Sequence, residues 1–538
     1  MRSCELLIRG AHLIDGTGAS AGAAEIAVSH DSIIAIDTDL PVEADCVIDA
    51  AGKVAAPGFV DIHSHSDLTI FVNPAAESKV RQGVTTEING QCGFTPFPAH
   101  PADYALLDAL CPFITEKPAY SWVSTADFLA RLRAARPSIN EGQMVGHGAL
   151  RAWVLGFENR PATPEEIEGI ARAADEALQQ GAIGISLGLA YPLGSFAKTD
   201  ELLAVARVAA RRGALLSVHI RSEGAELVQS LQEMIDIARR VADAGPLKLQ
   251  IDHLKASGRR WWGSIDRALE TIEQAGAEGL DIAFDVYPYT AGSRHLSGSL
   301  PSWVHDGGNE AVMARLQDPD CRRRLREEHE AWLRGQSTVS PFELDLQHIV
   351  ITDVATQANR ATVGKTLEQI GAERDQDPLD AALDMLVEEK GHISIVLFSM
   401  SEEDMQKALA HPLGCIGTDG LVFAPYGPLS RGRPHPRCYG TFPRAIGHYA
   451  RERRIMSLEE AVRKCTALPA SRLGLTDRGR LAEGMKADIV IFDPDTLIDR
   501  ATYEDPHRYP EGIEYVIVNG KITIESGRHT EAGAGAVV

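Results

Sequence analysis

"LLSVHIRSEGAELVQSLQEMIDIARRVADAGPLKLQIDHL", residues 215–254, contains one complete strand–helix–strand unit. Its two ends, 215–220 and 247–254, are short and mostly apolar, which favours buried strands of a parallel sheet. The segment between them, 223–245, has apolar residues at helical spacing. Because parallel strands need a crossover connection of this length, usually a helix, the stretch predicts one βαβ unit.

The same alternation of strands and helices continues through the middle of the chain. The helix predicted at 163–181 opens with Thr163 as N-cap, carries Glu166 at the capping-box position and closes on Gly181. The further predicted strands are 83–89, 144–149, 182–188, 282–289 and 415–420. This pattern over some 400 residues predicts an α/β fold, namely a closed (β/α)₈ barrel of the TIM type with insertions.

Two more apolar segments, 348–354 and 393–398, bring the strand candidates above eight. The charged, helix-like stretch at about 294–345 is the expected insertion. The barrel with this insertion is assigned to residues 56–474.

The two ends of the chain share a sequence pattern that differs from that of the middle. Residues 1–53 alternate apolar and polar residues between Gly, Asp and Asn turns, and the same pattern returns at 478–494 and 514–527. We expect one small β-sandwich domain built from both termini, residues 1–55 and 475–538. The small-residue tail "EAGAGAVV" is expected to be disordered.

Composition limits the function classes. The 538 residues are 44% apolar and 24% charged, with a formal net charge of −22, which argues against a nucleic-acid partner or an anionic membrane. The eight cysteines form no disulfide framework. The first residues lack a signal-peptide pattern, and no window is apolar enough to predict a membrane span. A reduced, cytoplasmic location is therefore expected.

Two histidines follow a predicted strand in "PGFVDIHSHSD", residues 57–67. The strand is 59–62, so His63 and His65, two residues apart, project to the same side. Such a pair can bind one metal ion, although this short pattern also occurs by chance.

Three further polar residues stand where apolar strands end: His219, His253 and Asp419. Each alone is readily explained as a capping or hydrogen-bonded residue. Together with the histidine pair they would all lie at the carboxyl ends of barrel strands, where barrel enzymes collect their catalytic groups. Imidazoles with a carboxylate suit Zn²⁺ or a similar ion.

Cys92 follows another predicted strand, within the turn "NGQCGFTPFP", residues 89–98. Packing, nucleophilic attack and disulfide formation are alternatives to metal binding. The nearby histidines have a better use as ligands than as a base, and a reduced compartment disfavours disulfides. A metal thiolate fits, with flanking glycines that allow the turn to aim the sulfur inward.

Ordered motifs over nearly the whole chain resemble the N-acyl-D-amino-acid deacylases (D-aminoacylases) of the amidohydrolase superfamily. They include "VAAPGFVDIHSHSD", "GVTTEINGQCG", "GHGALR", "GAIGISLGLAYPLGSFAKTDEL", "VHIRSEG", "IDHLKASGRRWWG", "DVYPYTAGS", "GTDG", "HPRCYGTFPR" and "RGRLAEGMKADIVIFDP". Their order along the chain is more specific than any single motif.

The resemblance implies a zinc centre with six ligands. His63, His65 and Asp419 would surround one metal position, and Cys92, His219 and His253 the other, tighter one. One zinc ion is expected, and a second, bridged by Cys92, remains open. Related cyclic-amide hydrolases use a carboxylated lysine as the bridge, but the strands at 144–151 and 184–188 contain no lysine.

The resemblance also implies hydrolysis of N-acyl-D-amino acids to a carboxylate and a free D-amino acid. Asp419 would act as general base and then general acid. Lys255 and Tyr287 are the expected carboxylate contacts, and Tyr191 and Arg221 are further substrate-binding candidates.

Each substrate contact has a structural alternative: a surface lysine for Lys255, core packing for Tyr287 and an ion pair with Glu223 for Arg221. Arg294 could meet an acidic substrate side chain or face solvent. The Arg-rich loop at 431–444 could contribute anion contacts or a lid, and His147 could support the metal site or be a hydrogen-bonded strand residue.

Two other functions stay open at this point. The same metal centre could hydrolyse another amide, either cyclic (a hydantoin) or peptide-like, or the fold could serve as a non-catalytic binding protein. The expected partner is a small-molecule substrate, with neither nucleic acid nor membrane, and self-association into a homo-oligomer is open.

Overall fold

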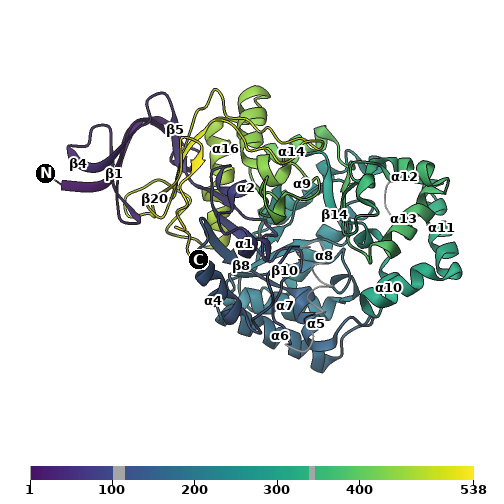
Figure 1. Ribbon diagram of the computed structural model, residues 1–538. Coiled ribbons are helices and arrows are strands. Elements are labelled where there is room, and N and C mark those ends of the chain that lie inside the picture. The colour runs from purple at the N-terminus through teal and green to yellow at the C-terminus, as the bar shows by residue number, and fades with distance from the viewer. Residues whose placement is uncertain (1, 101–103, 105–115, 338–345) are drawn as a thin grey trace.

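The computed structural model describes residues 2–100, 104, 116–337 and 346–538. Figure 1 shows a helix-covered barrel between two smaller parts. A β-sheet near both chain termini lies at one side of the barrel, and a lobe containing α10 to α13 lies at the other. Among the described residues, none of the helices combines the length and the apolarity that crossing a bilayer requires.

Eight strand positions form the barrel, and all their pairings are parallel. Two sheets contribute: β6-β7-β8 and β9-β10-β11-β12-β13-β17. The chain runs directly from β8 into β9, and a parallel bridge between Ser64 and Gly420 links the segments after β6 and β17. The strands are β6 (Phe59–Asp61), β7 (Val84–Asn89), β8 (Asn140–Gln143) with β9 (Val145–Gly146), β10 (Gly184–Gly188), β11 (Leu215–His219), β12 (Lys248–Ile251), β13 (Asp281–Val286) and β17 (Gly414–Ile416). The predicted barrel is confirmed.

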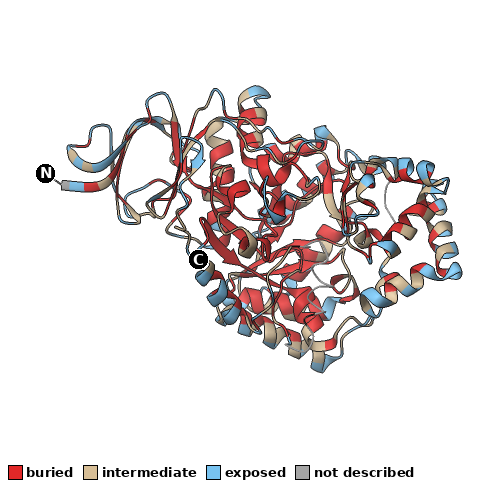
Figure 2. Cartoon of the chain, in the orientation of Figure 1, coloured by how far each residue is buried: buried red, intermediate tan, exposed pale blue. Residues whose placement is uncertain are grey.

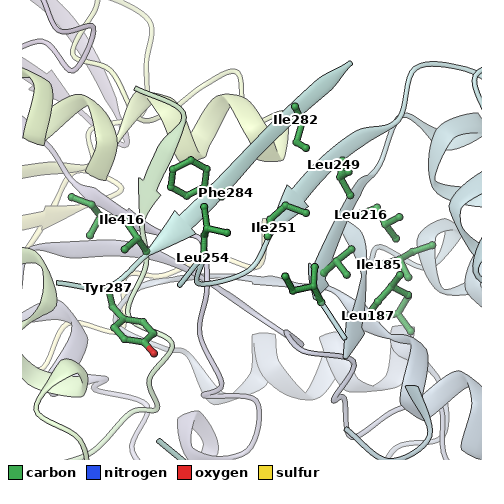
Figure 3. Close-up of a cluster of buried hydrophobic side chains, with 14 of the residues drawn as sticks. Ile185, Leu187, Leu216, Leu249, Ile251, Leu254, Ile282, Phe284, Tyr287 and Ile416 are labelled. Carbon is green, nitrogen blue, oxygen red and sulfur yellow. The ribbon is translucent and has the colours of Figure 1, made fainter. Parts of the chain in front are cut away.

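Apolar side chains that alternate along these strands form the core between the strands and the helices. Apolar side chains at every second position, such as Ile185 and Leu187 on β10, form one buried cluster across neighbouring strands (Figure 3). Among the described residues, the helices of the barrel segment include α4 (Thr125–Ala135), α5 (His147–Leu155), α6 (Pro164–Gln179), α7 (Thr199–Arg212), α8 (Leu227–Arg240), α9 (Ile265–Ala277), α14 (Glu402–Ala410), α16 (Leu458–Cys465) and α17 (Ala467–Leu473). Buried residues concentrate in the strands, while the outer helix faces are exposed (Figure 2).

The capping pattern in the sequence correctly predicts the start of one helix. α6 begins with the predicted capping box, in which Thr163 and Glu166 exchange side-chain and backbone hydrogen bonds. The strand predicted at 144–149 instead ends at Gly146, because α5 starts with His147.

The two surplus strand candidates lie outside the barrel. They form β15 (Ile349–Val354) and β16 (Ile393–Leu397), which pair antiparallel, and β16 also pairs with β14 (Gly292–His295). Their sheet packs with four helices around an apolar core of its own. These helices are α10 (Gly308–Gln317), α11 (Pro319–Leu333), α12 (Leu367–Arg374) and α13 (Pro378–Glu388). The whole lobe lies between β13 and β17 in the chain.

The terminal segments form one nine-stranded sheet, in which β18 pairs with β5 and so joins the two ends of the chain. One apolar cluster beneath it takes residues from both ends. The strands are β1 (Arg2–Leu13), β2 (Gly22–Ser29), β3 (Ser32–Asp37), β4 (Val42–Asp49), β5 (Val54–Pro57), β18 (Ile489–Phe492), β19 (Ile513–Val518), β20 (Lys521–Glu525) and β21 (Arg528–His529).

The expectation of a disordered tail is wrong. The tail pairs with β8: the Glu141 N–H donates to the Ala536 carbonyl at 2.8 Å, and the Val538 N–H donates to the Glu141 carbonyl at 3.0 Å. Small residues permit this close approach, since a Cβ on Gly535 would overlap the Ile139 carbonyl.

Candidate metal centre

The six predicted ligands converge at the carboxyl ends of the barrel strands, and each is at most 8% exposed. Five different strands deliver them. The positions are His63 and His65 after β6, Cys92 after β7, His219 at the end of β11, His253 after β12 and Asp419 after β17.

Cys92 lies at the centre of this cluster. Its Sγ is 3.5 Å from His63 Nε2, 3.5 Å from His219 Nδ1 and 3.5 Å from His253 Nε2. With Zn–N and Zn–S bonds of roughly 2.1 and 2.3 Å, tetrahedral ligands would stand about 3.5 Å apart. The donor set and its spacing therefore fit a zinc ion.

A second group shares one member with the first. Asp419 Oδ1 lies 3.1 Å from His65 Nε2 and 3.7 Å from His63 Nε2, and these three side chains are close enough to hold one ion. His63 thus lies between the two metal positions.

The turn that carries Cys92 packs so tightly that it requires glycines on the neighbouring strands. Cys92 has a φ of +54°, in the left-handed region that L residues seldom adopt. The turn packs directly on the neighbouring strand ends: a Cβ on Gly188 would overlap the Cys92 carbonyl, and one on Gly146 would overlap the Gly93 carbonyl. Only glycines on β9 and β10 let the turn bring the sulfur this close.

Burial shifts the pKa of Cys92, His219 and His253, whereas at His63 the Asp285 carboxylate outweighs burial and raises the pKa well above its ordinary value. Burial raises the pKa of the Cys92 thiol to about 12, so a cation is needed to favour the thiolate. Burial lowers the pKa of His219 and of His253 well below the ordinary value. These two rings are therefore neutral at neutral pH, which is the form that binds metal.

Carboxylates on the far side of the rings orient them. Asp285 Oδ1 lies 3.2 Å from His63 Nδ1, and Glu223 Oε1 lies 2.9 Å from His253 Nδ1. Carboxylates in this position fix the ring tautomer of ligand histidines. Neither residue was assigned this role from the sequence. The only signals were that Glu223 lies four residues after His219 and that Asp285 lies near the end of β13.

We expect Glu223→Gln to weaken zinc binding by about 10- to 100-fold, because a neutral amide oxygen accepts the His253 Nδ1–H bond more weakly than a carboxylate and leaves the ring a poorer ligand. Competition with a chelator of known affinity measures this change. Glu226→Gln, an exposed change in the same segment, should leave zinc affinity as in the wild type. Equal affinity in both variants would contradict the orienting role.

Beside the cluster, Lys255, Tyr287 and Arg437 surround a cationic recess. The Lys255 ammonium and the Arg437 guanidinium lie 5.7 and 4.8 Å from the Tyr287 ring centre. The buried Tyr287 hydroxyl and Arg437 Nε have no hydrogen-bond partner among the described residues. The recess can therefore donate hydrogen bonds to an anion.

Each cation of the recess already faces one carboxylate. Lys255 Nζ lies 2.5 Å from Glu223, and Arg437 Nη1 lies 2.9 Å from Asp419 Oδ2. Burial works against the charge of Lys255, but Glu223 raises its pKa to about 12. Arg437, the first residue of α15 (Arg437–Pro443), lies within the Arg-rich loop but was not singled out from the sequence.

Of the other two predicted substrate contacts, Tyr191 lies at the site and Arg221 forms a structural ion pair. Tyr191 lines the site, with its ring centre 4.6 Å from that of His219. Arg221 forms an ion pair with Glu233 at 2.8 Å and donates to the Ala197 carbonyl, which favours its structural alternative with a different partner.

Arg294 lies on β14 and lines the site rather than facing only solvent. His147 binds Glu201 at 2.7 Å, which favours its hydrogen-bonded alternative.

A cavity of about 560 Å³ opens directly onto this cluster. His65, Cys92 and Asp419 line its inner end, and β14, α10 and the loop after β17 contribute further walls. The volume is in the range of pockets that bind small molecules.

A barrel that gathers imidazoles, a thiol and a carboxylate at one end, beneath a cavity, has the architecture of a metal-dependent hydrolase. Residues 46–524 match the amidohydrolase family. The chain belongs to this family.

Its relatives confirm the resemblance seen in the motifs. A D-aminoacylase from Alcaligenes xylosoxydans xylosoxydans is 35% identical over 99% of this chain and 97% of its own. A D-aminoacylase structure described as having a binuclear metal centre, with one-metal activation and second-metal attenuation, superposes with a TM-score of 0.81 (34% identity, 99% of both chains). An N-acyl-D-glutamate deacylase from Bordetella bronchiseptica, solved with zinc and a phosphonate mimic of the tetrahedral intermediate, has a TM-score of 0.83 (32% identity, 100% and 99% coverage).

Proposed function

We propose that this chain is a zinc-dependent deacylase that hydrolyses N-acyl-D-amino acids to a carboxylate and a free D-amino acid. One observation carries the proposal: a recess with unpartnered buried donors lies directly beside the thiol–imidazole–carboxylate cluster. A substrate with an amide next to a carboxylate, as in an N-acyl-amino acid, matches these two features. The relatives named above act on such compounds.

Zinc held by Cys92, His219 and His253, with His63, His65 and Asp419 as a second position, would polarise the amide carbonyl and activate water. The chain's own groups handle the proton. Burial alone would raise the pKa of Asp419, but the charge of Arg437 and the hydrogen bond with His65 lower it well below its usual range. Asp419 is therefore ionised at neutral pH, can accept the proton of the attacking water and can pass it to the departing nitrogen.

The recess orients the substrate. Lys255, Tyr287 and Arg437 bind the α-carboxylate, which fixes the Cα next to Asp419. With the carboxylate and the amide both held, the two hands of the amino acid direct their side chains to opposite sides of the Cα. This difference supports discrimination between D and L substrates, and Tyr191 lines the site at this point.

A substrate panel with metal analysis tests the proposal. N-acetyl-D-leucine, N-acetyl-D-glutamate, their L forms and a hydantoin are compared on one zinc-assayed sample. We expect turnover of D compounds only, its loss on chelation and its return with zinc. Turnover of the cyclic compound alone would establish another amidohydrolase activity. Absence of bound zinc after supplementation would favour a binding protein.

A further inference from the structure

The cavity above the metal centre extends well beyond the space that an N-acetyl substrate needs. Its outer part, here called the outer chamber, has apolar walls. These are Phe94, Phe157, Val312, Leu421, Phe423 and Leu429. They come from segments far apart in the chain, including the turn after Cys92, the loop after Asp419 and α10.

The apolar walls begin at the metal centre itself. Asp419, Leu421 and Phe423 all line the cavity, whereas Val422 between them is fully buried in the barrel core. The turn after β7 repeats this order, with Cys92 followed two residues later by Phe94. Apolar side chains therefore follow two of the predicted ligands along the cavity wall.

The size of the cavity exceeds that of a short substrate. N-acetyl-D-leucine has about twelve non-hydrogen atoms, and even at the roughly 30 Å³ that a water molecule occupies it would take about 360 Å³. The cavity holds about 560 Å³. About a third of it would remain beyond such a substrate.

Polar side chains do not change the apolar character of the chamber. Arg431 is paired with Asp353 at 3.2 Å, and burial lowers the pKa of His295 to about 3, so that ring is neutral. Asn309, Glu310 and Arg433 are exposed and mark the open end. Arg294 lines both this cavity and the small cavity beside Lys255, so its charge lies toward the metal centre. The apolar walls farther out do not favour a charged ligand.

The residues at which the outer chamber opens onto the metal centre indicate which part of the substrate enters it. Lys255 and Tyr287 line an adjoining small cavity, together with His219 and His253, and hold the Cα end of the molecule. Asp419 lines both cavities, and Arg437 lines the large one 4.8 Å from the Tyr287 ring centre. The outer chamber instead meets the site at His65, Cys92 and Asp419, where the carbonyl carbon must lie. The group bonded to that carbon is the acyl chain.

We propose that the outer chamber binds the acyl group, and that the substrates of this chain are N-acyl-D-amino acids with apolar acyl chains longer than acetyl. The proposal rests on the deacylase function proposed above. It names the part of the substrate that the cavity selects.

Gly298 offers a way to fill the chamber. It lines the cavity, and a Cβ added there would lie 3.8 Å from the Tyr191 ring, which is ordinary contact. Gly298→Phe should therefore occupy chamber space without backbone strain. Gly276→Phe is the matched control, because Gly276 lies on the exposed face of α9 with open space around its Cα.

Calorimetric titration with acetate, hexanoate and octanoate tests the chamber independently of turnover. In the zinc-loaded wild type, affinity should rise about two- to fourfold for each methylene that enters the chamber. Gly298→Phe should abolish this dependence on length, and Gly276→Phe should keep it. Equal affinity for all three carboxylates in the wild type would overturn the proposal.

Turnover measurements then distinguish failure of the acyl-chamber proposal from failure of the proposed deacylase function. N-acetyl-, N-hexanoyl- and N-octanoyl-D-leucine are compared with N-acetyl derivatives of D-alanine and D-phenylalanine. We expect kcat/KM to rise at least about tenfold from acetyl to hexanoyl. A rise with the amino-acid side chain alone would overturn the acyl assignment. Absence of turnover for every compound, with length-dependent carboxylate binding intact, would refute the deacylase function instead.

Discussion

Asp419→Asn should abolish turnover, with a loss of at least about 10³-fold in kcat, while much of the bound zinc remains. The amide keeps the size of the side chain but cannot accept the proton of the attacking water. Zinc should persist because Cys92, His219 and His253 are untouched. Steady-state kinetics and metal analysis on the same sample measure both effects.

Asp495→Asn is the matched control, since Asp495 is exposed in the terminal segment. It should behave as the wild type in both measurements. An Asp419→Asn enzyme with more than about a tenth of wild-type kcat would contradict the proton-transfer role. Loss of all zinc would instead show that Asp419 is essential for metal binding.

Cys92→Ala should lower zinc affinity by at least about 100-fold and reduce activity with it, because a direct ligand matters more than the groups that orient ligands. Three ring nitrogens lie 3.5 Å from the Cys92 sulfur, so the thiol is their common neighbour. Removing it leaves the tighter metal position with only two of its three protein ligands, His219 and His253. Chelator competition and kcat with excess zinc measure the loss.

Cys46→Ala provides the comparison, because Cys46 is an exposed thiol on β4. It should keep full zinc content and activity. Circular dichroism establishes that Cys92→Ala is folded, and Cys92→Ser repeats the test with a side chain of similar size. Normal zinc and full activity in both Cys92 variants would refute the ligand hypothesis.

The barrel was predictable because each strand carries its own local signal. Apolar segments followed by amphipathic helices indicate parallel strands wherever they occur, and polar residues at their ends indicate one shared edge. The same local signal cannot say which sheet a strand joins. The segments that became β15 and β16 therefore looked like barrel strands, although their hydrogen-bonding partners are each other and β14.

The predicted ligands came together because strand ends in a barrel meet at one edge. Their orienting partners were not predictable in the same way. Glu223 reaches His253 from a different segment, and Arg437 reaches Asp419 from the start of α15. Such contacts depend on the path of loops and on side-chain rotamers, which spacing in the sequence does not encode. The terminal tail was misjudged for a related reason, since its partner strand lies some 400 residues earlier in the chain.

The bridge between the first and last barrel strands has a consequence for folding. Ser64 and Gly420 are 356 residues apart, and closing so long a loop carries a large entropic cost that local contacts cannot offset early. The histidine pair and Asp419 meet only when this closure is complete, so metal capture is linked to a late folding event. Mutations that loosen the last strand should therefore weaken the metal position formed by His63, His65 and Asp419 without altering a single ligand.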